Sequence, residues 1–189
     1  MSSDRRFADA LTKEAPALRA FARSLAKRDA QADDLVQETL CKAWARRDTF
    51  QEGTKLLAWL FTILRNHFYS EKRKERRMIE DPNGIYVSSL LTMPAQDGEV
   101  GLVEFDDAFS QLTAEHKEAL FLVGACGLTY EETGAICGCP AGTVKSRVNR
   151  ARSALSRHLG GSWHQVGPDA AVLAVQSFRE MSGEANVAA

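Results

Sequence analysis

The feature that most constrains the fold is a segment, Thr129 to Leu155, with the pattern of two helices joined by a tight turn. Thr129 and Glu132 have the spacing of a capping box, which marks the start of a first helix. Gly138 to Pro140 then interrupts the helical pattern. Beyond this turn, apolar residues recur at helical spacing and predict one buried stripe, made of Val144, Val148, Ala151 and Leu155. The segment therefore predicts a helix-turn-helix.

The other face of the second predicted helix is basic. Residues 141–158 contain five basic residues and no acidic one. Such a face suits DNA phosphates and base edges, and the backbone N–H groups at a helix start favour a phosphate. Most protein–DNA contacts go to the DNA backbone, so phosphate is the expected target of any single side chain. The predicted DNA contacts are Gly142, Thr143, Lys145, Ser146, Arg147, Asn149 and Arg150.

Charge is segregated along the chain, although the 189 residues have a formal net charge of only −1. Residues 61–77 hold six basic and two acidic residues, whereas residues 78–107 hold seven acidic residues and no basic one. This alternation predicts two basic modules separated by an acidic connector. Proline and glycine punctuate the connector, so we predict domains at 1–77 and 104–160, a linker at 78–103 and a C-terminal extension at 161–189.

Helical periodicity predicts an all-α protein made of two small domains joined by an irregular acidic linker. The predicted helices are 6–13, 15–26, 30–45, 55–74, 104–112, 114–126, 130–136 and 141–158, with one more at 168–181. No run of apolar residues is long enough for a membrane span, and the N-terminus lacks the apolar core of a signal peptide. The four cysteines form no framework typical of secreted domains, so a cytoplasmic protein is expected.

Two helices of the first domain have polar faces. On the helix at 30–45, the expected apolar stripe is Val36, Leu40, Ala43 and Trp44, and the polar face is Asp34, Gln37, Glu38 and Cys41. A solvated surface is the more common explanation of such a face. On the helix at 55–74, the face expected to be exposed is Thr62, Arg65, Asn66, Tyr69 and Arg73. Arginine, asparagine and tyrosine together suit unpaired bases, and a basic helix end that complements the helix dipole is equally compatible.

Three segments together resemble the bacterial sigma factors of the extracytoplasmic-function type. Residues 33–44 (DDLVQETLCKAW) are similar to the polymerase-binding helix of that family, and residues 50–74 to its strand-opening and −10 recognition segment. Residues 128–155 are similar to its −35-binding helix-turn-helix. Within the family, the sequence GAICGCPAGTVKSRVNRAR at 134–152 is similar to the general-stress-response subgroup of alphaproteobacteria.

The resemblance implies a protein that binds core RNA polymerase, through the β′ clamp helices and the β subunit, and directs it to promoter DNA. The implied polymerase contacts are Asp33, Asp34, Gln37, Glu38 and Trp44. The implied −10 contacts are Thr62, Arg65, Asn66, Tyr69, Lys72 and Arg73, and the loop at 47–55 lies where the family captures a flipped base. A small soluble helical anti-sigma factor would hold the protein inactive, and the free protein is expected to be monomeric.

Other classes of protein fit the sequence less well. Cys137 and Cys139 are separated by one residue, and no C-x-x-C pair occurs, so no metal site, cofactor or enzymatic activity is expected. A sigma-like mimic that binds only an anti-sigma factor is one alternative, but such proteins also carry a receiver domain. An ordinary helix-turn-helix regulator is another, but it would not need the segments at 33–44 and 50–74.

Overall fold

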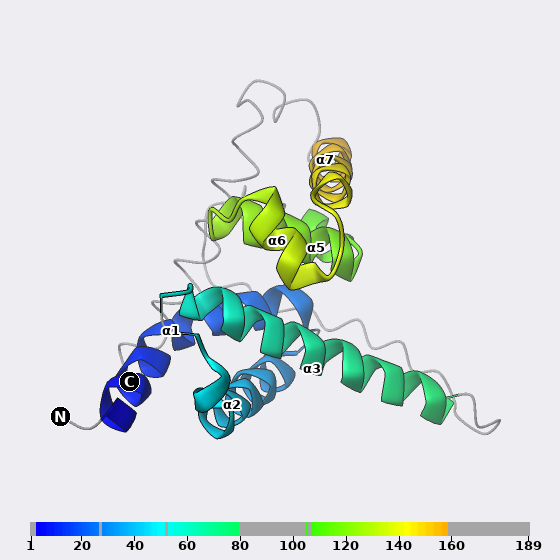
Figure 1. Cartoon of the computed structure of the whole chain (residues 1–189). Helices are drawn as coiled ribbons and strands as arrows, with labels where there is room; N and C mark the ends of the chain where they lie inside the picture. Colours follow the sequence, from blue (N-terminus) through cyan, green and yellow to red (C-terminus); the bar gives the residue numbers. More distant parts are fainter. Residues whose placement is uncertain (1–2, 27, 52, 80–104, 106, 159–189) are drawn as a thin grey trace.

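The computed structural model describes residues 3–26, 28–51, 53–79, 105 and 107–158 (Figure 1). The elements of this part of the chain are all helical, which confirms the all-α prediction. Most of the predicted linker, from residue 80 onward, lies outside the described residues. The C-terminal extension with its predicted helix at 168–181 also lies outside them.

The first module consists of three long helices and one short turn of 3₁₀-helix. In chain order these are α1 (Ser3–Leu25), α2 (Asp29–Ala45), η1 (Arg47–Thr49) and α3 (Leu56–Ile79). Their apolar faces meet in a core in which Phe21 and Phe61 lie edge to face, with ring centroids 4.8 Å apart. Burying one such ring stabilises the fold by about 1.5–3 kcal/mol. This core fixes α2 and α3 relative to each other.

Helix α1 is continuous through Pro16, so the prediction of two separate helices at 6–13 and 15–26 was wrong. Proline lacks an N–H and normally breaks a helix interior at a cost of about 3 kcal/mol or more. Here Leu11 lies before the proline, and Leu18 and Phe21 follow it, and all three are buried. A continuous helix places both groups on the same core, and this apolar burial offsets the lost hydrogen bond.

The second module contains the helix-turn-helix. Its elements are α5 (Ala114–Leu120), a π-helical turn η2 (Phe121–Ala125), α6 (Tyr130–Cys137) and α7 (Ala141–His158). The predicted capping box is confirmed: the Glu132 N–H donates to Oγ1 of Thr129, and the Thr129 N–H donates to Oε2 of Glu132. Gly138 ends α6 in the left-handed conformation, with φ of 65°. The predicted stripe on α7 is also confirmed as buried.

A Thr129→Ala substitution should lower the free energy of unfolding by about 1 kcal/mol, because it removes the oxygen that accepts from the first turn of α6. Thr129→Ser keeps that oxygen and should stay close to wild type. Urea unfolding followed by circular dichroism measures both. Equal midpoints for the alanine variant and wild type would show that the capping box does not stabilise α6.

The two modules pack against each other through apolar side chains. Helix α5 contacts α1, and α6 contacts α3. Phe121 of η2 lies against Phe21 of α1, with ring centroids 5.4 Å apart, so the buried residues of both modules form one cluster. Helices α5 and α6 lie between the first module and α7, while α2 lies at the opposite end of the molecule (Figure 1). We call this the closed arrangement.

Candidate polymerase and promoter interfaces

The polar face of α2 borders an open groove between α2 and α3. The groove has a volume of about 880 Å³. Four exposed residues of α2 line it: Asp34, Gln37, Glu38 and Cys41. This is the polar face that the sequence predicted on the helix, and the part of the structure described here leaves it accessible to a partner.

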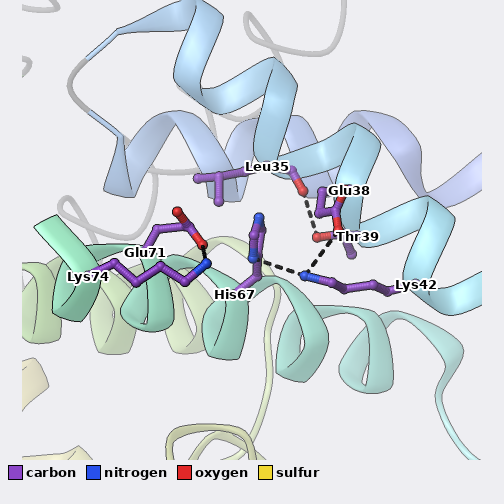
Figure 2. A network of polar contacts seen from close by, with 7 residues as sticks. All are labelled: Leu35, Glu38, Thr39, Lys42, His67, Glu71 and Lys74. Atoms are coloured by element: carbon purple, nitrogen blue, oxygen red, sulfur yellow. Dashed lines mark hydrogen bonds and ion pairs between the residues drawn. The ribbon is translucent and has the colours of Figure 1, made fainter.

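A network of polar contacts joins α2 to α3 within this groove (Figure 2). Nζ of Lys42 lies 3.0 Å from Nδ1 of His67 and 3.2 Å from Oε1 of Glu38. Burial, and then the positive charge of Lys42, lower the pKa of His67. The neutral imidazole can accept a hydrogen bond from the lysine through Nδ1. The contact ties the polar face of α2 to the helix that carries the predicted −10 residues.

Two predicted polymerase contacts differ from the others. Asp33 forms an ion pair with Arg19 of α1, with Nε and Oδ1 2.8 Å apart, so its carboxylate is already engaged within the module. Trp44 is 39% exposed, and the prediction that it belongs to the buried stripe was wrong. It packs instead on Phe7, and the guanidinium of Arg47 lies over its ring. These contacts hold a large apolar ring at the surface.

An aromatic cluster that the sequence analysis missed surrounds the loop after α2. Phe50 contacts Phe7 and Trp59, with ring centroids 6.1 and 5.4 Å apart. Phe7 also contacts Trp44, so rings from α1, α2, the loop and α3 meet at one place. The sequence shows these residues far apart, and only packing brings them together. Aromatic rings beside a loop suit stacking with an unpaired base.

The predicted −10 face of α3 is only partly exposed, which corrects the expectation of an open face. Thr62 is half-buried, and its hydroxyl donates to the Ala58 carbonyl. Asn66 and Arg73 are exposed. The Lys72 ammonium lies 4.6 Å from the centre of the Phe68 ring. The remaining two predicted residues on this face are covered by the second module.

These two residues, Arg65 and Tyr69, contact a buried carboxylate of α5. The Arg65 side chain is 19% exposed, and its Nε lies 2.5 Å from Oε1 of Glu118. The Tyr69 hydroxyl lies 3.5 Å from Oε2 of the same residue. Burial, and then the negative charge of Glu118, raise the pKa of Tyr69, which keeps the phenol protonated. Glu118 could not be predicted as part of this site, because a glutamate within a helix is normally solvated.

The basic face of α7 carries the predicted −35 residues. Gly142, Lys145, Asn149 and Arg150 are exposed. Thr143, Ser146 and Arg147 are half-buried. The Ser146 hydroxyl donates to the Thr143 carbonyl at 2.8 Å, and Nη1 of Arg147 lies 3.7 Å from Sγ of Cys139. The helix therefore presents its lysine, asparagine and one arginine outward, which suits a DNA groove.

Three further findings concern metal ligands, thiols and membrane-spanning segments. Among those residues, no three histidine, cysteine or acidic side chains lie together as metal ligands would. All four cysteines are free thiols, and burial raises the pKa of Cys137 to about 12. None of the described helices combines the length and apolar character needed to cross a bilayer.

Comparison with known proteins defines the class. Residues 11–78 match the family Sigma-70 region 2, and residues 102–155 match Sigma-70, region 4. Together they cover more than half of the chain, in the order that places α2 and α3 before the helix-turn-helix. The chain belongs to the sigma-70 family of RNA polymerase sigma factors, which are not enzymes.

Individual relatives narrow this class to the extracytoplasmic-function (ECF) type. The chain is 51% identical to the ECF RNA polymerase sigma factor EcfG of Rhodopseudomonas palustris, over 88% of this chain and 93% of the relative. It is 36% identical to the ECF sigma factor SigC of Mycobacterium tuberculosis, over 66% and 68% of the two chains.

A solved structure agrees with these sequence relatives. The chain resembles the sigma factor RpoE of Bartonella quintana, solved in complex with the anti-sigma factor NepR, with a TM-score of 0.74 and 50% identity over 82% of this chain and 97% of that one. The similarity covers both modules.

Proposed function

We propose that this chain is the sigma factor of a general stress response, binding core RNA polymerase mainly through the exposed polar face of α2. The observation that carries the proposal is the 51% identity to EcfG across both modules. Asp34, Gln37 and Glu38 offer two carboxylates and an amide on one accessible face, beside the groove between α2 and α3. Asp33 and Trp44 flank this face and complete the proposed polymerase-binding set.

We assign promoter recognition to two further surfaces. The −10 element would contact α3 through Thr62, Arg65, Asn66, Tyr69, Lys72 and Arg73. The −35 element would contact α7 through Gly142, Thr143, Lys145, Ser146, Arg147, Asn149 and Arg150. The first surface belongs to a domain at 1–77 and the second to a domain at 104–160. Polymerase holds both domains, so each can bind DNA weakly and still contribute through raised effective concentration.

An anti-sigma factor is the proposed regulator. RpoE of Bartonella quintana, 50% identical to this chain, was solved in complex with the anti-sigma factor NepR. We propose that a small soluble helical protein of that kind holds this chain inactive in the cytoplasm, and that the free chain is a monomer.

In vitro transcription tests the proposal. The full chain, added to core polymerase, should start transcripts from a template carrying the −35 and −10 elements of its own stress genes, and a NepR-type protein should suppress them. Polymerase without the chain is the control. Anti-sigma binding without transcription would instead favour the sigma-like mimic, and a stable homodimer that binds a palindrome would favour an ordinary regulator.

A further inference from the structure

One carboxylate is buried where the two modules meet. Glu118 belongs to α5 and is 0% exposed. Its cationic partner, Arg65, belongs to α3 of the other module, and Nε of Arg65 lies 2.5 Å from Oε1 of Glu118. Tyr69 of α3 completes the contact from the same side. Glu118 therefore sits in the second module while the charge that compensates it sits in the first.

The surroundings of Glu118 make the ionised carboxylate depend on Arg65. The charged or titratable groups that face it are Arg65 and Tyr69 from α3, Cys137 from α6 and Arg147 from α7. Burial raises the pKa of Glu118, and the attraction of Arg65 only partly offsets this effect. A buried ion pair need not add net stability, but removing one partner leaves a buried charge uncompensated and is strongly destabilising.

The second ion pair between the modules has a different character. Nζ of Lys55 lies 2.6 Å from Oε1 of Glu132, but the lysine side chain is 64% exposed. Water and salt screen such a pair, so it contributes little. Of these two ion pairs, the one between Arg65 and Glu118 is withdrawn from solvent and the one between Lys55 and Glu132 is not.

We infer that Glu118 makes closure of the two modules conditional on Arg65. While the modules touch, Arg65 has to stay beside Glu118. When Arg65 turns to another anion, the modules have to separate so that the carboxylate regains water. That anion is −10 promoter DNA, an assignment that rests on the proposed function, whereas the conditional closure does not. Binding of Arg65 to DNA and the closed arrangement are therefore mutually exclusive.

Thiol labelling of the full chain tests the closure directly. Cys137 is 5% exposed and lies beside Glu118, so its labelling rate reports opening, and the exposed Cys41 is an internal standard. At pH 8, Arg65→Gln should raise the Cys137 rate relative to Cys41 at least about tenfold, because it leaves Glu118 unpaired. Adding Glu118→Gln to that variant should return the rate to within about twofold of wild type, since no buried charge remains.

Four further measurements sharpen the test. In the Glu118→Gln variant, Cys137 should be labelled no faster than in wild type, because the substitution removes a charge that is costly to bury. Lowering the pH should reduce the effect of Arg65→Gln on the Cys137 rate relative to Cys41, because Glu118 takes up a proton. The same relative rate should not change with pH in the double variant. Lys55→Gln, which breaks the exposed pair, should stay within about twofold of wild type. Small-angle X-ray scattering on the same samples should show a larger radius of gyration for Arg65→Gln only.

The inference is overturned if Arg65→Gln labels at the wild-type rate, or if the double variant is as open as the single one. A tenfold faster Cys137 labelling rate for Glu118→Gln alone would also overturn it. This variant keeps Arg65, so the comparison can be made even if Arg65→Gln does not fold. None of these measurements uses polymerase or promoter DNA. A chain that shows the coupling but supports no transcription would therefore reject the proposed function and leave the conditional closure intact.

Discussion

A Glu38→Lys variant should bind core RNA polymerase at least about 30-fold more weakly than wild type, because losing one partner of an interfacial charge pair costs about 2–5 kcal/mol. Glu38 is exposed on α2 at the groove, and reversing its charge adds repulsion to the lost attraction. Titration of fluorescently labelled core polymerase with the full chain measures the affinity. Transcription at limiting concentration should fall in the same proportion.

The substitution should leave the fold intact. In the described part of the chain, Glu38 forms an ion pair with Lys42 one turn away on the exposed helix surface, at 3.2 Å, and such helical pairs are worth about 0.3–0.5 kcal/mol. Asp9→Lys is the matched control, since it makes the same charge change at an exposed position of α1 outside the groove. Equal losses for the two variants would assign the effect to overall charge. Unchanged affinity for Glu38→Lys would show that polymerase does not bind this face.

Gly134→Ala should destabilise the second module, although alanine in a helix interior normally stabilises by about 1 kcal/mol relative to glycine. A Cβ at this position would lie 2.6 Å from the backbone oxygen of Cys139. That oxygen belongs to the turn between α6 and α7, so the turn would have to move away from α6. Overpacking of this kind costs about 1–3 kcal/mol.

Gly142→Ala is the matched control, because a Cβ there meets nothing within 4 Å. Its stability should equal or slightly exceed that of wild type. Thermal unfolding followed by circular dichroism compares the two variants, and only Gly134→Ala should lower the midpoint. A raised midpoint for Gly134→Ala would mean that α6 and the turn do not approach as closely as the structure places them.

The helix-turn-helix could be predicted from the sequence because its determinants are local. The capping box needs two residues three positions apart, and the buried stripe of α7 needs only helical spacing. The polar face of α2 was predictable for the same reason, since Asp34, Glu38 and Cys41 follow one period. Each of these features depends on residues within a few helical turns of one another, so the packing of the helices does not change it.

The remaining features depend on what covers a helix face, and periodicity carries no information about that. Tyr69 and Glu118 are separated by 49 positions, so nothing local indicates that they meet. The same reason explains the misplaced Trp44, whose exposure is set by Phe7 and Arg47. The helices predicted at 6–13 and 15–26 form one helix because apolar residues on both sides of Pro16 are buried in the same core.

Arg65 lies against Tyr69 and Glu118 in the closed arrangement, on the helix face assigned to the −10 element. Under these assignments, a substitution at residue 65 that changes promoter recognition also changes the contact with Glu118. Such a substitution alters how readily the two modules separate. A compensating substitution at Glu118 is then needed to keep the free protein in the closed arrangement. The pair would then vary together among relatives, so a shift in target sequence would bring with it a shift in basal activity.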